Sequence, residues 1–206
     1  MENLDEIVDK LIHSPHLKII MQKIDESLSE EKEKRQAFYA LVDENVKAEF
    51  INGEIVYQSP VKQSHWNASA NISSKLIQFV KDRKLGEIAV EKAMVSLSRN
   101  DYEPDICFWR KEVADAFTAD QMHFPAPDFI IEIISPSTEQ FDRNEKLIDY
   151  AAHQVKEYWI VDPQKKTIEK YLNQNWAYEL AEKLQQGKIY SHTIEGFSIE
   201  LSEVFS

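Results

Sequence analysis

A chain of 206 residues, with 43% hydrophobic and 29% charged residues, has an ordinary globular composition and enough apolar residues for one substantial core. Its formal net charge of −12 argues against broad, sequence-independent coating of nucleic acid, because phosphate contacts need Lys and Arg, but leaves room for a local basic cleft or a metal-dependent site. No apolar stretch approaches the roughly 20 residues that a bilayer-crossing helix needs.

The N-terminus and the cysteine content favour a cytoplasmic location. Residues 1–6 are acidic and lack the basic start and apolar core of a secretory signal. Cys107 is the only cysteine, so no internal disulfide can form, and its apolar neighbours predict a buried thiol in a reducing compartment. We therefore expect a cytoplasmic protein without a membrane partner.

The first 42 residues have the spacing of helices, expected at 2–12 and 16–42. Ser14-Pro15 separates them, and this pair suits a helix start. The longer helix carries an apolar stripe made of Leu17, Ile20, Met21, Ile24 and Leu28. We interpret residues 1–37 as an N-terminal helical arm whose stripe packs on the main domain, residues 38–206, or on a second copy.

Residues 47–57 have the pattern of a β-hairpin. Asn52-Gly53 is the preferred pair for a two-residue type I′ turn, which places Phe50 opposite Ile55 and Glu49 opposite Val56. Glu49 and Glu54 then share one face of the hairpin. Both acids pointing to water is one interpretation, and a role for Glu49 in a site is the other.

An amphipathic helix is expected at residues 65–84, ended by Gly86. His65, near its start, is expected to be a cap or a surface residue rather than a ligand. Residues 61–84 carry five bases against the single acid Asp82. These bases form either a solvated face or a phosphate-facing stripe, for which Lys62 and Lys75 are the candidates.

The second half of the chain alternates strands and helices. We expect β-structure at 87–98 and 104–109, a helix or loop over 111–127, a strand at 128–134, a helix at about 138–153 and a strand at 157–162, followed by hairpin-like pieces at 167–172 and 175–181. The strand-helix-strand unit at 128–162 implies a parallel pair with a crossover helix. The fold class is therefore α/β, with a mixed sheet flanked by helices.

Two of these strands each carry a carboxylate in apolar surroundings. Glu132 lies among four isoleucines and Phe129, and Asp105 follows Pro104. An ionised carboxylate in such a place is costly unless it is paired, hydrogen-bonded or bound to a metal. If the strands are neighbours, the two acids could hold Mg²⁺ or Mn²⁺. The alternatives are a buried basic partner for Glu132 and a turn-shaping role for Asp105.

A metal-dependent hydrolysis of phosphate esters also needs positive charge beside the metal. Lys146 lies on the helix that leaves the Glu132 strand, with Arg143 and Tyr150 on the same helix face. Tyr150 is a further candidate for facing a phosphate. Taken alone, Lys146 would be an ordinary surface lysine.

Several blocks of the sequence together resemble a known family. They are residues 49–54, His65, Pro104-Asp105, Glu132 to Thr138, Asp142, Lys146, Tyr150 and Glu157 to Pro163. Over roughly residues 38–205 the chain resembles the Uma-type restriction endonuclease family of the PD-(D/E)xK nuclease superfamily. The resemblance implies a restriction-endonuclease-like fold, metal-dependent phosphodiester hydrolysis and often a dimer.

The same resemblance implies roles for individual residues. Asp105 and Glu132 would be the catalytic, metal-binding acids, and Glu49 an additional acid from the hairpin. The chain departs from the superfamily pattern at Ile134, where a lysine is usual. Lys146 matches the family's lysine on the next helix and would supply the charge from there.

Three functions follow as hypotheses. The first is a Mg²⁺- or Mn²⁺-dependent endonuclease that acts on DNA as a homodimer. The second is a nuclease-fold protein that has lost catalysis and serves as a nucleic-acid-binding or assembly module, which Ile134 and the net charge of −12 both favour. The third, glycoside hydrolysis by a carboxylate pair, is less favoured because a lysine partner suits phosphate better.

Overall fold

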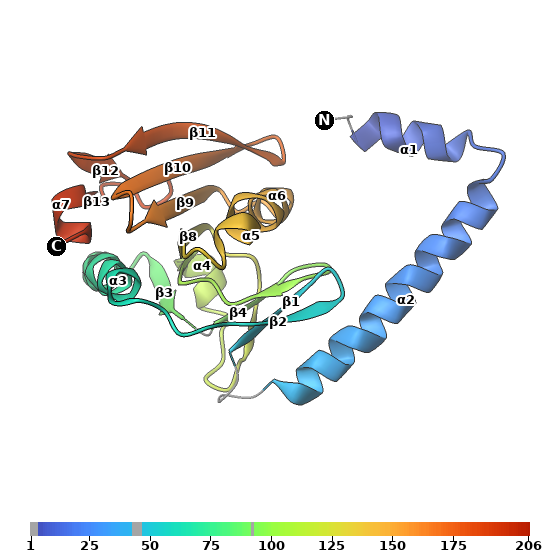
Figure 1. Ribbon diagram of the computed structural model, residues 1–206, viewed down its shortest axis with the longest axis horizontal. Coiled ribbons are helices and arrows are strands. Elements are labelled where there is room, and N and C mark those ends of the chain that lie inside the picture. Colours follow the sequence, from blue (N-terminus) through green and yellow to red (C-terminus); the bar gives the residue numbers. More distant parts are fainter. Residues whose placement is uncertain (1–3, 43–46, 92) are drawn as a thin grey trace.

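The computed structural model describes residues 4–42, 47–91 and 93–206 (Figure 1). Its elements, in chain order, are α1 (Leu4–Ile12), α2 (Leu17–Leu41), β1 (Ala48–Ile51), β2 (Glu54–Tyr57), α3 (Gln63–Arg83), β3 (Gly86–Val90), β4 (Met94–Ser96), β5 (Asp101–Tyr102), β6 (Ile106–Arg110), α4 (Lys111–Ala114), β7 (His123–Phe124), β8 (Phe129–Ile133), α5 (Glu139–Arg143), α6 (Glu145–Ala152), β9 (Glu157–Asp162), β10 (Thr167–Gln174), β11 (Ala177–Leu184), β12 (Lys188–Tyr190), β13 (Ser198–Glu200) and α7 (Leu201–Val204). Within these ranges no helix has the length and apolarity to span a bilayer.

A six-stranded sheet in the order β11-β10-β9-β8-β6-β3 forms the centre of the protein. β8 and β9 pair in parallel, with Glu132 opposite Ile160, and α5 and α6 connect them. This confirms the predicted strand-helix-strand unit. On its other edge β8 pairs antiparallel with β6, with Ile106 opposite Ile131. The strands that carry the two candidate acids are therefore neighbours.

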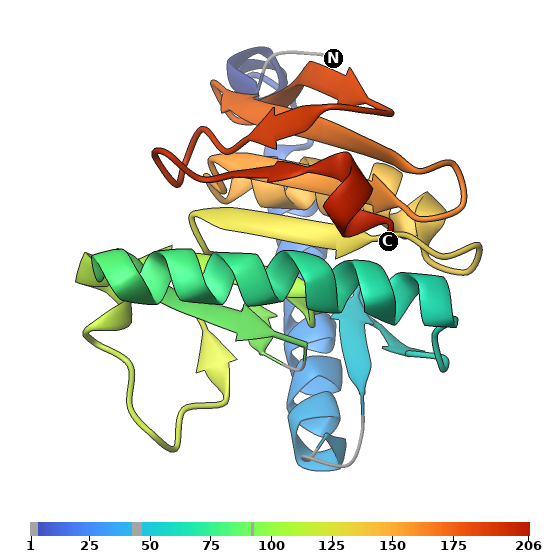
Figure 2. The same cartoon turned by 90° about the vertical axis from the view of Figure 1, so that its left-hand side faces the viewer.

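The two faces of this sheet are buried in two different cores. One core contains alternate residues of β8 together with residues of α3 and of the C-terminal elements β12, β13 and α7. Figure 2 shows α3 lying across this face of the sheet. The other core contains Ile130 and Ile134, together with Tyr150 of α6 and residues of β4 and β5. Because side chains alternate along a strand, Glu132 points to this second side.

A second sheet, in the order β2-β1-β5-β4-β7, brings the N-terminal hairpin to the same region. The hairpin has the predicted register, and the turn residues Asn52 and Gly53 have φ of 51° and 82°. The predicted β-stretch at 87–98 is divided, since β3 belongs to the first sheet and β4 to the second. Local periodicity cannot show such a change of sheet.

Three predicted helix boundaries are corrected by the structure. The helix expected at 138–153 is two helices, because Asn144 (φ −123°, ψ −81°) interrupts it between α5 and α6. α3 ends at Lys84 in the left-handed conformation (φ 55°), whereas Gly86 begins β3. α2 begins at Leu17, with His16 at the cap position, rather than at Ser14-Pro15.

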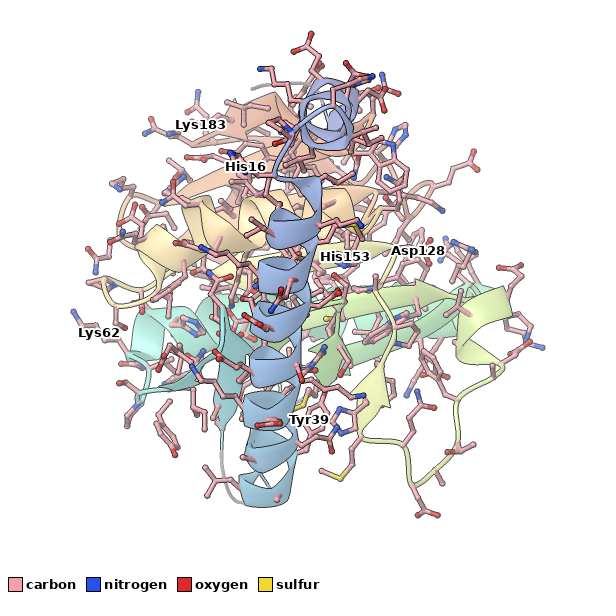
Figure 3. All side chains as sticks on the ribbon, turned by 90° about the vertical axis from the view of Figure 1, so that its right-hand side faces the viewer. His16, Tyr39, Lys62, Asp128, His153 and Lys183 are labelled. Atoms are coloured by element: carbon pink, nitrogen blue, oxygen red, sulfur yellow. The ribbon has the colours of Figure 1, made fainter. Side chains whose placement is uncertain are left out.

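The C-terminal part of α2 contacts the main domain, while the start of the helix and α1 project away from it (Figure 1), and Figure 3 shows α2 along the side of the molecule. Arg35 Nε lies 2.6 Å from Asp101 Oδ2, and Phe38 is fully buried against Phe50. Apolar residues of the stripe, nearer the start of α2, are exposed, since 44% of the surface of Ile24 and 46% of that of Leu28 are accessible to solvent. The expected packing of this stripe on the main domain is therefore not found, and packing on a second copy stays a prediction.

Candidate active site

The ammonium group of Lys146 lies at the centre of a buried cluster of acids. Its Nζ is 2.9 Å from Glu49 Oε1, 3.0 Å from Glu132 Oε1 and 3.3 Å from Asp142 Oδ1. These acids come from β1, β8 and α5, so both sheets and the crossover helices contribute. The Lys146 side chain is only 3% exposed. Lys146 therefore lies beside Glu132 in the interior, and not at the surface as the lysine taken alone would be expected to lie.

Asp105, immediately before β6, lies beside Glu132 on the neighbouring strand β8. The backbone N–H of Asp105 donates to Glu132 Oε2 at 3.4 Å, and the backbone N–H of Ile133 donates to Asp105 Oδ2 at 2.7 Å. His65, from α3, brings its Nε2 to 3.3 Å from the same Asp105 oxygen. Asp105 and Glu132 therefore converge, as the sequence predicts for neighbouring strands.

The electrostatics of the cluster show an excess of negative charge. Burial raises the pKa of Glu132 to about 8; Lys146 opposes this shift, while Asp142, Asp105 and Glu49 add to it. Burial likewise raises the pKa of Asp142. Burial alone would lower the pKa of Lys146, but its carboxylate neighbours hold it well above its usual value. One ammonium cannot compensate three ionised acids, so without a further cation these carboxyls tend to keep their protons.

Asp105 behaves differently from its neighbour. Burial disfavours its charged form, but the His65 contact and the Ile133 N–H outweigh burial and lower the pKa of Asp105. Asp105 is therefore the ionised member of the pair at neutral pH. A divalent cation favours the deprotonated form of Glu132, and with the ionised Asp105 beside it the two carboxylates are a suitable pair of ligands.

A cavity of about 340 Å³ opens beside these acids. Glu103, Asp105, Glu132, Asp142 and Lys146 line it, together with Lys47, Lys62, His65 and the hydroxyl residues of the segment 135–138. Carboxylates, amines and hydroxyls thus surround one space, which has the chemistry needed for a hydrated cation and a phosphate group.

The other predicted site residues have different positions. Glu49 is buried and also accepts from Gln58 Nε2 at 2.9 Å and from the Glu103 N–H, so it does not point to water. Lys62 lines the cavity and lies at the edge of the molecule in Figure 3. Lys75 instead pairs with Glu203 at 2.7 Å and is not among the cavity residues.

Tyr150 does not face a phosphate. It is fully buried and donates its hydroxyl to Glu132 Oε1 at 2.9 Å, because its helix packs directly on the sheet. Arg143, expected on the same helix face, contacts Glu139 and Glu169, since the break at Asn144 turns α5 away from α6. The prediction for Tyr150 is therefore corrected.

Sequence reasoning assigned no site role to two residues of the cluster. Asp142 lies four residues before Lys146, a spacing usual for exposed helix pairs, and nothing local indicates that this pair is buried. His65 was expected to be a cap or a surface residue, yet it is 6% exposed and contacts Asp105. Both appear only in the set of residues that carry the family resemblance.

The residues fit a divalent cation held by few protein ligands. Among the residues that the structure describes, no three His, Cys, Asp or Glu form a preformed metal cage. Mg²⁺ does not need one, because it usually keeps several waters and binds through one or two carboxylates plus substrate phosphate. Asp105 and Glu132 supply that number of carboxylates, beside a cavity that has room for water.

Comparison with known proteins gives the family and the fold of this chain. The Uma2 family, described as "Putative restriction endonuclease", matches residues 35–202. The chain belongs to the Uma2 family. A crystal structure described as "a putative nuclease belonging to DUF820", from Anabaena variabilis ATCC 29413, superposes with a TM-score of 0.71 at 18% identity, over 82% of this chain and 94% of that one. This likeness shows the restriction-endonuclease-like fold.

A relative of similar sequence is "Uncharacterized protein sll1609" of Synechocystis sp. (strain ATCC 27184 / PCC 6803 / Kazusa). The two sequences are 31% identical over 120 residues, which make up 56% of this chain and 66% of the relative. The match thus covers slightly less than two thirds of the relative's length. Family and fold together point to a nuclease.

In this Uma2 chain the ammonium group beside Glu132 comes from helix α6. Ile134, at the position where the superfamily usually has lysine, is 6% exposed and belongs to the second core. Lys146 reaches Glu132 from α6 instead, at 3.0 Å. A charged group is thus present beside Glu132 although the strand position is apolar.

Proposed function

We propose that this protein is a Mg²⁺-dependent endonuclease, also able to use Mn²⁺, that hydrolyses phosphodiester bonds of DNA. The observation that carries the proposal is the meeting of Asp105, Glu132 and Lys146 at one cavity, with the Lys146 ammonium 3.0 Å from Glu132. The family description supports the nuclease class, and the excess of negative charge in the cluster supports a cation.

Asp105 and Glu132 would hold the ion. When bound, such an ion lowers the pKa of a water and offsets charge on the phosphate in the transition state. Lys146 neutralises part of the charge on Glu132 and adds a positive group at the cavity, where negative charge develops during hydrolysis. Lys62 and Lys47 line the same cavity and supply the contacts for phosphates beside the scissile one.

Cleavage of supercoiled plasmid tests this function. Wild-type protein with Mg²⁺ or Mn²⁺ should nick or linearise the plasmid, and EDTA should stop the reaction. Glu132→Ala should abolish it, while Glu54→Ala, which removes a hairpin acid whose side chain is 80% exposed, should not. Cleavage that persists unchanged in Glu132→Ala refutes the assignment.

A second candidate is a nuclease-fold protein without catalysis that binds nucleic acid or organises an assembly. Ile134 and the net charge of −12 favour it. Calorimetric titration with Mg²⁺ discriminates, because an assembly module has no need of a cation site with millimolar or tighter affinity.

We also propose that the protein acts as a homodimer. The exposed apolar residues of α2 support a partner that covers them, because an apolar stripe on a projecting helix favours burial. Light scattering on wild type and on Leu28→Glu tests this assembly. A monomeric mass for the wild type would contradict it.

A further inference from the structure

His65 is held against one oxygen of Asp105. Its Nε2 lies 3.3 Å from Asp105 Oδ2, and its side chain is 8% exposed. The start of α3 shows no side-chain cap, so the capping role expected from the sequence does not explain this histidine. Its Nδ1 is buried and has no hydrogen-bond partner among the described residues. A proton carried on Nε2 is within reach of Asp105 Oδ2.

The two oxygens of Asp105 consequently have different surroundings. Oδ2 accepts from the Ile133 N–H of β8 at 2.7 Å and lies 3.3 Å from Nε2 of His65, on α3. Oδ1 accepts no hydrogen bond from the part of the chain that the structure describes, and Asp105 lines the cavity. Two donors from separate elements therefore fix the carboxylate and leave one oxygen for an outside ligand.

Glu132 shows the same division between its oxygens. Oε1 accepts from Lys146 at 3.0 Å and from the Tyr150 hydroxyl at 2.9 Å. Oε2 accepts only a long bond, 3.4 Å from the Asp105 N–H, among the described residues. In both acids, protein donors occupy one oxygen and leave the other nearly free. This repetition points to an arrangement for coordination rather than to ordinary stabilisation of buried charge.

We propose that His65 is a positioning residue that ties Oδ2 of Asp105, so that Oδ1 is presented to the divalent cation. The inference rests on the proposed function, because it presumes that Asp105 is a metal ligand. His65 itself does not touch the ion. Residues that orient metal ligands in this way commonly change metal affinity by about 10- to 100-fold when they are replaced.

Binding of Mn²⁺ to the full chain, measured by electron paramagnetic resonance of the free ion, tests the proposal. His65→Phe should weaken binding about 10- to 100-fold. His65→Gln should bind within a few-fold of wild type, because its amide can donate to the same oxygen. Ser69→Ala, a buried residue one turn later on α3, is the matched control and should bind like wild type.

The outcomes separate the two levels of the proposal. A folded His65→Phe that binds Mn²⁺ as tightly as wild type overturns the role of His65, as does a His65→Gln that binds no better than His65→Phe. If His65→Phe does not fold, His65→Asn, whose shorter amide does not reach Oδ2, replaces it in the comparison with His65→Gln. Wild type that binds no Mn²⁺, or Asp105→Asn that binds normally, refutes the metal site itself.

Discussion

Replacing Lys146 with Met should strongly destabilise the protein in metal-free buffer at pH 8. The ammonium lies within 3.3 Å of Glu49, Glu132 and Asp142, and all four side chains are nearly inaccessible to water. At 4 Å and an effective dielectric constant of about 20, one such attraction is worth about 4 kcal/mol, partly offset by the cost of burying the lysine. Removing one partner of a buried ion pair costs about 3–5 kcal/mol, which is the loss we expect.

Urea unfolding followed by fluorescence of the buried Trp109 and Trp159 measures this loss. At pH 5 the loss should be smaller, because the carboxylates left behind can bind protons. Millimolar Mg²⁺ at pH 8 should restore part of the stability, because it supplies the missing positive charge. The control is Lys75→Met, whose lysine is half exposed and pairs with Glu203 at the surface, and its stability should change little. A loss below about 1 kcal/mol for Lys146→Met at pH 8 would refute the reasoning.

Three further predictions concern the same structure. Glu132 has a pKa raised to about 8 in the folded protein against 4.5 ordinarily, so its stabilising contribution is full below 4.5 and lost as pH rises through about 8. The free energy of unfolding of metal-free wild type, relative to Glu132→Gln, should therefore fall between pH 5 and pH 8.5, and a rise across this range contradicts the assignment. Tyr150→Phe removes a hydrogen bond to Glu132 Oε1 and should cost about 1.5–3 kcal/mol in urea unfolding; no change would show that the bond is unimportant. Gly86→Ala should destabilise far more than Gly187→Ala, because a Cβ at Gly86 would lie 2.0 Å from the Trp109 carbonyl oxygen whereas one at Gly187 meets nothing within 4 Å; equal melting temperatures for the two variants would contradict this.

Features set by local chemistry were predictable from the sequence. The Asn52-Gly53 turn fixed the hairpin register residue by residue, because this pair accepts positive φ. The crossover from β8 to β9 followed from the order of elements, and the cost of an unpaired carboxylate singled out Glu132. Local chemistry also forms the turn after β9, where Asp162 Oδ1 accepts from the N–H groups of Gln164 and Lys165.

Features set by packing between distant segments were not predictable. The division of 87–98 between two sheets and the burial of His65 depend on partners far along the chain. Helical spacing likewise did not predict the break at Asn144 or the burial of Asp142. Tyr150 illustrates the difficulty, since a tyrosine one turn beyond a lysine has the same local pattern whether it faces a cavity or donates to a buried acid. The direction of the Glu49 side chain was likewise open until its strand was placed beside β5.

The central claim is that Asp105 and Glu132 remain together in a buried site because they share a divalent cation. A crystal soaked in Mn²⁺ tests it directly through the anomalous signal of the ion. We expect one anomalous peak in the cavity, in contact with Asp105 Oδ1 and Glu132 Oε2. This peak should disappear in Asp105→Asn. A well-ordered cavity that stays free of Mn²⁺, or an ion bound away from both acids, would contradict it.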